Sequence, residues 1–130
     1  MVAVISCSHF PDDERIYHRE ISALHEQNYV IKYFTLSDLK TNLSQPGINH
    51  KNYNLSKVSL DEYLACVEKD LIKEPPKVVH IHEPELFSVA LKIKILFNTK
   101  IVYDVHEDYI SMVDTFSSLT WPLKSLKIKY

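Results

Sequence analysis

The sequence predicts an α/β fold: a doubly wound, mostly parallel, Rossmann-like sheet with helices on both faces. Two short apolar runs, 78–82 and 100–105, show little polar alternation before their last residues, which is typical of strands buried on both faces of a parallel sheet. Between them, Pro84 suits the first position of a helix. The helix then has apolar residues at helical spacing: Leu86, Val89, Ala90, Ile93 and Phe97. Strand, helix and strand make a right-handed βαβ unit.

The first third of the chain predicts a strand, a helix and a second strand. Residues 2–6 form a short apolar strand, and Asp12 or Asp13 caps a helix that runs to about residue 27. The apolar stripe of this helix contains Ile16, Tyr17, Ile21, Ala23 and Leu24. Asn28 suits the left-handed position that ends a helix, and residues 29–36 form the second strand.

The middle of the chain predicts a polar surface loop at 37–47 and a short third strand near 49–53. Ser59 and Glu62 have the spacing of a capping box, which opens a helix to about residue 73. The side chains expected to point inward are Leu60, Leu64, Val67 and Leu71. The element order is β-α-β-β-α-β-α-β, which is typical of a doubly wound sheet.

If the strand order is 3-2-1-4-5, the chain reverses direction across the sheet between strands one and four. Ligands in such sheets bind outside the carboxyl ends of the strands, at this switch point. The loop at 9–15 then lies beside the loop at 82–85, with His106 one strand further along. We therefore expect three polar loops to meet in one crevice.

Composition limits the classes of function. A chain of 130 residues with 45% hydrophobic residues and a net charge of −2 predicts one globular domain, with no electrostatic argument for nucleic acid. Gly47 is the one glycine, so the glycine-rich phosphate-binding motifs are absent. Cys7 and Cys66 are far apart, which favours free thiols in a reducing compartment. With no signal peptide or membrane span in the sequence, we expect a cytoplasmic protein.

The ends of the two strands in the βαβ unit carry the candidate site residues. His80 and His82 are two residues apart and share one face of a strand, His80 being the deeper, structural one. Glu83 follows His82, and the second strand ends in His106, Glu107 and Asp108. The imidazoles and carboxylates leave open a metal-dependent hydrolase built from the HxH and DVHED segments. A non-catalytic α/β binding module is also open, because fold alone does not fix function.

Several segments, in order, carry a family resemblance. They are HFP at 9–11 with DERIYHRE at 13–20, Leu24 with NYV at 28–30, VHIHEPEL at 79–86, VYDVHEDY at 102–109, and WPL at 121–123. Together they resemble the N-terminal domain of glycosyltransferase family four, a retaining family of GT-B fold. Asn28 stands where relatives usually have glycine, and Glu83 where Asp is commoner.

The resemblance implies two Rossmann-like domains facing a cleft. The N-terminal domain mostly holds the acceptor, and the C-terminal one holds the nucleotide-sugar through a Glu-x7-Glu motif and basic residues. Residues 1–130 are then a single acceptor-side domain, and the nucleotide-sugar domain is absent from the chain. The implied activity is transfer of a sugar to a saccharide or lipid-linked acceptor in bacterial surface polysaccharide biosynthesis, with no metal and no other cofactor.

The resemblance also suggests roles for individual residues. His106 is the expected catalytic residue, hydrogen-bonding a hydroxyl of the donor sugar near the reacting carbon. The expected substrate-binding residues are Asp13, Arg15, His82, Glu83, Glu107 and Asp108. Arg15 reaches a phosphate or pairs within its helix, and Glu20 is a supporting or solvated residue. The tail at 121–130 interleaves apolar residues with three lysines, which predicts self-association or contact with anionic lipid at the inner face of the membrane.

Overall fold

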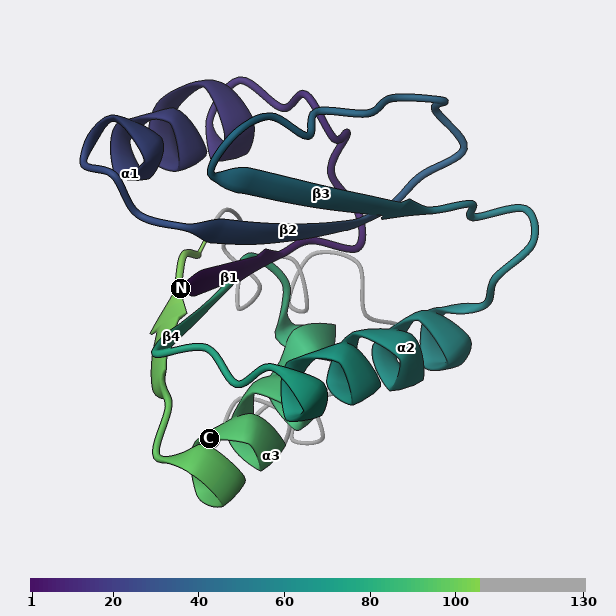
Figure 1. The fold of residues 1–130 in the computed structure, drawn as a ribbon. Helices are drawn as coiled ribbons and strands as arrows, with labels where there is room; N and C mark the ends of the chain where they lie inside the picture. Colours follow the sequence, from purple (N-terminus) through teal and green to yellow (C-terminus); the bar gives the residue numbers. More distant parts are fainter. Residues whose placement is uncertain (106–130) are drawn as a thin grey trace, which may run out of the picture.

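A parallel sheet of five strands, in the order β3-β2-β1-β4-β5, forms the centre of the computed structural model, which describes residues 1–105 (Figure 1). The strands are β1 (Val2–Ile5), β2 (Ile31–Leu36), β3 (Ile48–Tyr53), β4 (Val78–Ile81) and β5 (Lys100–Tyr103). All four neighbouring pairs are parallel. The predicted α/β class and strand order are therefore confirmed, with the topological switch between β1 and β4.

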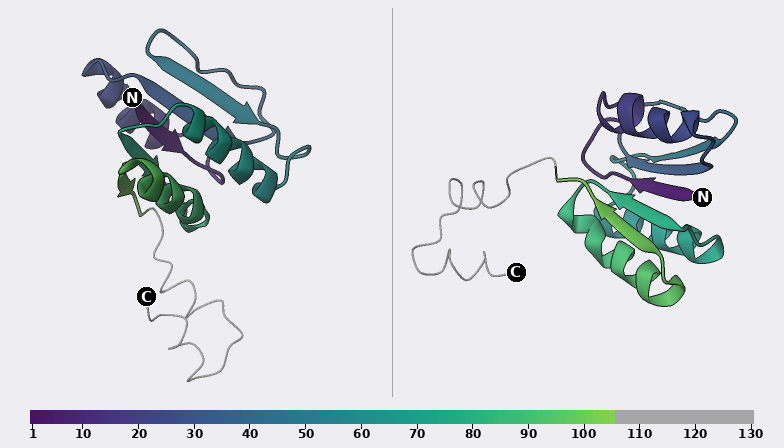
Figure 2. Two further views of the ribbon diagram at one scale, coloured as in Figure 1. Left: turned by 60° about the horizontal axis from the view of Figure 1, so that its bottom comes forward. Right: turned by 90° about the vertical axis from the view of Figure 1, so that its left-hand side faces the viewer.

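Helices cover both faces of this sheet. The helices α2 (Leu60–Lys73) and α3 (Phe87–Phe97) lie together on one face, and the π-helical segment η1 (Ile16–Ile21) and α1 (Ser22–Glu26) lie on the other (Figures 1 and 2). Because successive strand residues point to opposite faces, β1 contributes to both cores. Ala3 and Ile5 face α2 and α3, whereas Val2 and Val4 face η1.

Several predicted helix ends are confirmed, although the first helical segment starts at Ile16 with Arg15 before it, not at Asp12 or Asp13. Ser59 caps α2, and the Glu62 carboxylate accepts a hydrogen bond from the backbone N–H of Ser59, which completes the capping box. Asn28 and Asn98 both have left-handed backbone angles, with φ of 61° and 55°. Asparagine tolerates this region better than most residues other than glycine. A short 3₁₀ turn, η2 (Pro84–Leu86), precedes α3, so Pro84 starts the helical segment as expected.

The helix predicted to run without interruption to residue 27 instead begins as a π-helix. The backbone N–H of Glu20 bonds to the carbonyl of Arg15, five residues earlier. A π turn of this kind is wider than an α turn, and it changes which side chains share a face. Ile16 and Ile21 are buried, but Ala23 is exposed, so the predicted apolar stripe is wrong at that position.

Three further expectations are wrong at the edges of the fold. The strand at 100–105 is not buried on both faces, because β5 is the outermost strand of the described sheet and Val102 is 47% exposed. Phe97 is exposed rather than inward, since it lies in the last turn of α3, just before Asn98 reverses the chain. Tyr29 and Val30 are exposed and precede β2, which begins at Ile31.

Several expectations lie outside the described residues. These are the expected site residues His106, Glu107 and Asp108, and the tail at 121–130 with its expected self-association and lipid contact. Within residues 1–105, no helix has the length and apolar character needed to cross a bilayer.

Candidate functional site

The loops after β1 and β4 meet, as the strand order predicts, and Glu83 joins them. Its carboxylate accepts hydrogen bonds from the hydroxyl of Ser6 at 2.8 Å, the backbone N–H of Cys7 at 3.1 Å, and both the backbone N–H and the hydroxyl of Ser8 at 3.0 and 2.9 Å. Glu83 is buried, at 3% exposure. The structure thus places this predicted substrate ligand where it holds the β1 loop in position.

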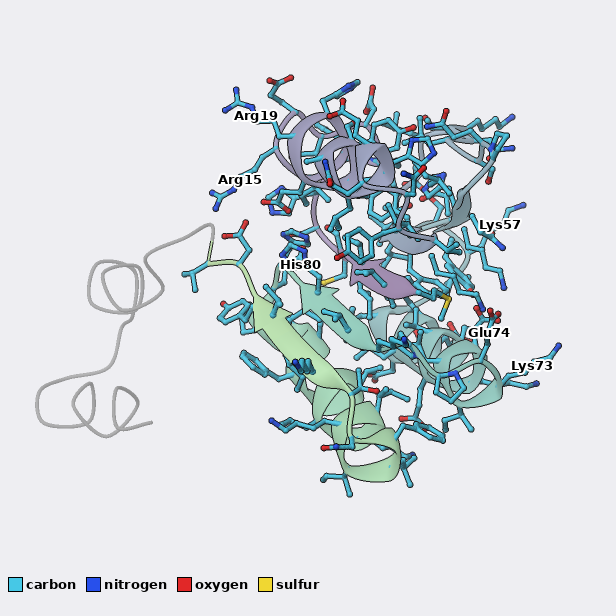
Figure 3. All side chains as sticks on the ribbon, turned by 60° about the vertical axis from the view of Figure 1, so that its left-hand side comes forward. Arg15, Arg19, Lys57, Lys73, Glu74 and His80 are labelled. Carbon is cyan, nitrogen blue, oxygen red and sulfur yellow. The ribbon has the colours of Figure 1, made fainter. Side chains whose placement is uncertain are left out.

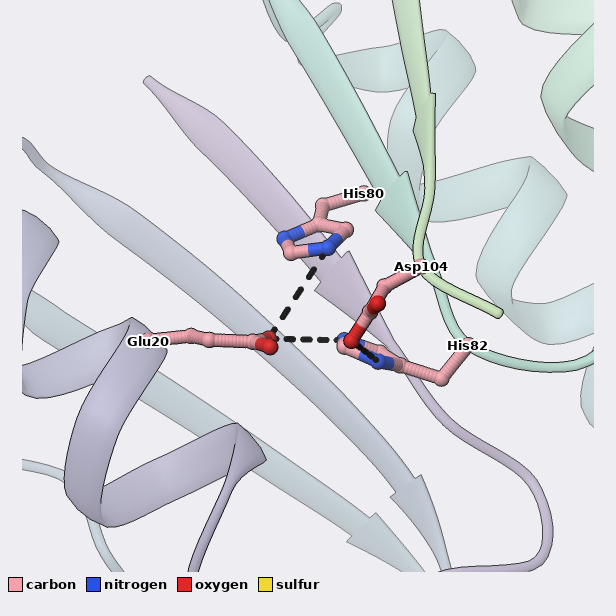
Figure 4. Close-up of side chains that lie close together, drawn as sticks. All are labelled: Glu20, His80, His82 and Asp104. Atoms are coloured by element: carbon pink, nitrogen blue, oxygen red, sulfur yellow. Dashed lines mark ion pairs between the residues drawn. The ribbon is translucent and has the colours of Figure 1, made fainter. Parts of the chain in front are cut away.

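Beside this junction, four side chains from three elements come together: Glu20, His80, His82 and Asp104, called the cluster below (Figure 4). Glu20 Oε2 lies 3.8 Å from His80 Nε2 and 3.6 Å from His82 Nε2. Asp104 Oδ2 lies 3.8 Å from the other ring nitrogen of His82, Nδ1. The two imidazole rings are 4.5 Å apart between centroids. The cluster therefore gathers two imidazoles and two carboxylates at the crevice.

The strand geometry explains how three of these side chains meet. His80 and His82 are two residues apart and therefore point to the same face of β4, the face on which η1 lies. His80 pairs with Val102 of β5, and Ile81 pairs with Tyr103, the last residue of β5. Asp104 follows Tyr103 directly and is therefore opposite His82. The backbone N–H of Asp104 also donates a hydrogen bond to the carbonyl of Ile81, which fixes the start of the loop.

The π turn explains how Glu20 reaches the cluster together with Arg15. In an α-helix, residues five apart point about 140° away from each other, whereas the i→i+5 hydrogen bond of a π turn brings them to adjacent positions. Arg15 Nε lies 3.4 Å from Glu20 Oε1. In Figure 3, Arg15 on the η1 side and His80 on β4 lie on the same side of the molecule. η1 thus directs both side chains toward the ends of β4 and β5.

Arg15 contacts both carboxylates of the cluster. It donates a short hydrogen bond through Nη2 to Asp104 Oδ1, in addition to its contact with Glu20. Burial and, after it, the neighbouring carboxyl of Asp104 raise the pKa of Glu20 to about 7, although Arg15 lowers it in part. Around neutral pH, Glu20 therefore exchanges readily between its acid and carboxylate forms, as acid–base groups at functional sites often do.

A hollow of about 430 Å³ opens beside the cluster. Its walls are mostly apolar and include Leu24, Tyr29, Val78 and Val102, with Glu20 and His80 supplying the polar part. Apolar walls with a few convergent polar groups are typical of small-molecule sites. A ligand in this hollow is in reach of the cluster and of the exposed Tyr29 ring.

The structure brings only some of the predicted site residues together. His82 belongs to the cluster, and Arg15 contacts it. Asp13 caps η1 instead, because its Oδ1 accepts the backbone N–H groups of Arg15 and Ile16 at 2.9 Å each. The expectation that His80 is the deeper histidine is wrong: the His82 side chain is 0% exposed and that of His80 is 13% exposed.

Three members of the cluster were not among the site residues expected for sugar transfer, although the hydrolase alternative used the HxH and DVHED segments. Glu20 was taken as supporting or solvated and His80 as structural, and Asp104 was not distinguished within its segment. The i, i+2 spacing was a sufficient signal for His80, since it must share the face of His82. For Glu20 the sequence holds no comparable signal, because nothing in it distinguishes a π turn from an α turn.

The cysteines add no reactive group to the site. Cys7 and Cys66 are both free thiols. Burial, followed by the negative charge of Glu83, raises the pKa of Cys7 to about 12, so the thiol stays protonated. A protonated thiol is a poor nucleophile and a poor metal ligand.

Compared with known proteins, the chain matches no family model, no curated protein sequence and no solved structure. The sequence motifs and the geometry of the cluster are therefore the features that bear on function.

Proposed function

We propose that the chain is the acceptor-side domain of a retaining glycosyltransferase of GT-B fold. Its second, nucleotide-sugar-binding domain would lie outside these 130 residues. The donor is a nucleotide-sugar, and the acceptor is a saccharide or lipid-linked saccharide of bacterial surface polysaccharide assembly, handled at the cytoplasmic face of the membrane. The observation that carries the proposal is the cluster at the carboxyl ends of β4 and β5, next to the topological switch, where sheets of this type bind ligands.

The cluster and the hollow suit a saccharide. Sugar hydroxyls both donate and accept hydrogen bonds, and the cluster offers carboxylate acceptors and imidazoles that serve in either role. Tyr29, half exposed in the wall of the hollow, offers a flat apolar surface for the C–H face of a sugar ring. Glu20, with its pKa raised to about 7, suits contact with an acceptor hydroxyl whose proton must move during transfer.

In this proposal, His106 positions the donor sugar. It follows Asp104 by two residues in the sequence and lies outside the described residues. In a retaining transfer, positive charge develops on the sugar ring as the diphosphate departs. A fixed hydrogen bond to a ring hydroxyl holds the sugar in a reactive pose, and a preorganised contact of this kind contributes about 2–4 kcal/mol to the transition state.

The test uses the protein encoded by the complete reading frame. We expect His106→Ala to lower kcat by roughly 30- to 1000-fold, with the acceptor KM within a few-fold of wild type. His18→Ala is the matched control, because His18 is an exposed histidine on η1. Near-normal kcat in His106→Ala would refute the assigned role, and absence of any sugar transfer by the wild-type protein would refute the function.

A metal-dependent hydrolase is the second candidate, and one observation favours it. His80 and His82 of the HxH segment meet Asp104 of the DVHED segment, and Glu20 completes a set of nitrogen and oxygen ligands. A zinc ion held in this way activates water for hydrolysis. Hydrolysis of a phosphoester or ester substrate that is lost with a chelator and restored by zinc would support this candidate, and its absence would exclude it.

A further inference from the structure

We propose that His80, His82 and Glu20 form a binding site for one divalent transition-metal ion, with zinc the best fit. The ligand atoms are Nε2 of both histidines and Oε2 of Glu20, and Asp104 lies near the other ring nitrogen of His82, Nδ1. This inference goes beyond sugar transfer, for which no metal is expected. It depends only on the geometry of these four side chains.

The spacing of the ligand atoms fits an ion. Oε2 of Glu20 is 3.8 Å from His80 Nε2 and 3.6 Å from His82 Nε2. These separations exceed the usual length of an N–H···O hydrogen bond. Two donors bound tetrahedrally to one zinc ion, at 2.0–2.2 Å each, are about 3.4 Å apart. A movement of the Glu20 carboxylate by a few tenths of an ångström therefore brings its oxygen to this separation from either imidazole nitrogen.

The surroundings of His82 resemble the second layer of contacts in a metal site. A histidine that binds metal through one ring nitrogen usually donates the other N–H to a carboxylate or carbonyl, which fixes the tautomer and the ring orientation. Asp104 Oδ2 lies 3.8 Å from His82 Nδ1, the ring nitrogen that the proposed ion leaves open (Figure 4). His82 is fully buried on β4, with β1 and β5 on either side, so its ring has little freedom to turn away.

Arg15 is the group that most directly opposes a cation here, and it contacts one oxygen of each carboxylate in the cluster. It contacts Oε1 of Glu20 and Oδ1 of Asp104, whereas Oε2 and Oδ2 face the imidazoles. The Arg15 side chain is also 49% exposed, so it has solvent into which it can withdraw.

The ligand set indicates the kind of ion. Two imidazoles and one carboxylate suit zinc and its transition-metal neighbours, whereas magnesium and calcium prefer oxygen ligands. Three protein ligands leave a fourth position for water or for a hydroxyl of a bound substrate. An ion in this position would also join η1 to β4, two elements far apart in the sequence.

The experiment is a zinc titration of the chelator-treated, 130-residue chain by calorimetry, with cobalt(II) absorption reporting the coordination. We expect one equivalent of zinc and the intense visible bands of four-coordinate cobalt. Glu20→Gln and His80→Gln should each weaken zinc binding by at least 10-fold, and Asp104→Asn by roughly 10- to 100-fold. Glu14→Gln and His18→Gln, exposed residues on the same side of the sheet, are the matched controls and should bind as wild type does.

A second readout on the wild-type chain covers the case in which a variant fails to fold. In ¹H–¹⁵N spectra of the histidine rings, zinc should shift Nε2 of His80 and His82 and leave the exposed His18 unchanged. The proposal is overturned if the wild type binds no zinc, if Glu20→Gln and His80→Gln bind zinc as tightly as wild type, or if zinc shifts other histidines but not these two.

Discussion

Replacing Glu83 by glutamine tests how the site is built. Glu83 Oε1 accepts three hydrogen bonds from Ser6 and Ser8, and Oε2 accepts one from the backbone N–H of Cys7. Glutamine keeps one oxygen but places an NH₂ group against the remaining donor or donors. Hydrogen bonds to a charged group contribute about 1.5–3 kcal/mol each, and a stranded buried donor costs about 1–3 kcal/mol. Because such terms do not add, we expect the variant to lose roughly 2–4 kcal/mol.

The assay is urea unfolding at pH 7, followed by circular dichroism, with free energies from linear extrapolation. Glu85→Gln is the matched control, because Glu85 is an exposed glutamate two residues away. It should change the free energy of unfolding by less than about 0.5 kcal/mol. If Glu83→Gln is no less stable than Glu85→Gln, Glu83 does not hold the β1 loop and the reasoning is wrong.

Three further predictions concern stability. Burial lowers the pKa of His50 to about 4, so on acidification this histidine takes up a proton in the unfolded chain before it does so in the folded one. The free energy of unfolding should therefore fall by up to roughly 3 kcal/mol as the pH drops from about 6.5 to 4. An NMR titration midpoint for His50 at or above 6.5 would contradict this. Asn28→Ala should cost about 1 kcal/mol while Asn28→Gly costs nothing, because of the left-handed φ of 61°; equal stabilities in thermal unfolding would count against it. Ser59→Ala should cost about 1 kcal/mol through loss of the α2 cap, whereas the nearby exposed Ser56→Ala should not; urea unfolding of both variants decides the matter.

Most of the fold followed from local patterns in the sequence. The capping box at Ser59 and Glu62 gave the start of α2, and Asn28 gave the end of α1, because both signals depend on backbone chemistry within a few residues. The alternation of elements predicted a doubly wound sheet, and the strand order considered for such a sheet is the one that the structure has. The sequence did not reveal which apolar side chains are exposed at the edges of the sheet. Val102 is as apolar as a buried residue, and it is exposed because it lies on the outermost described strand.

The candidate site was less predictable, because it depends on long-range geometry. His82 was expected to contact substrate at the mouth of the crevice, but η1 and the end of β5 bury it. Glu83 was expected to bind substrate together with His82. Because successive residues of an extended chain point to opposite sides, the Glu83 side chain points away from that of His82 and toward the β1 loop. Glu20 enters the cluster only because a π turn aligns it with Arg15. No periodicity in the sequence reports that turn.

The central claim is that the cluster and the hollow beside it face a saccharide acceptor. It is tested most directly by NMR of the isotope-labelled, 130-residue chain titrated with the acceptor that the complete protein uses in transfer. We predict chemical-shift changes centred on Tyr29, His80 and Val102, which line the hollow, and loss of these changes in Glu20→Gln but not in Glu14→Gln. Changes confined to the polar loop at 37–47, or none at a concentration of acceptor that saturates the complete protein, would contradict the claim.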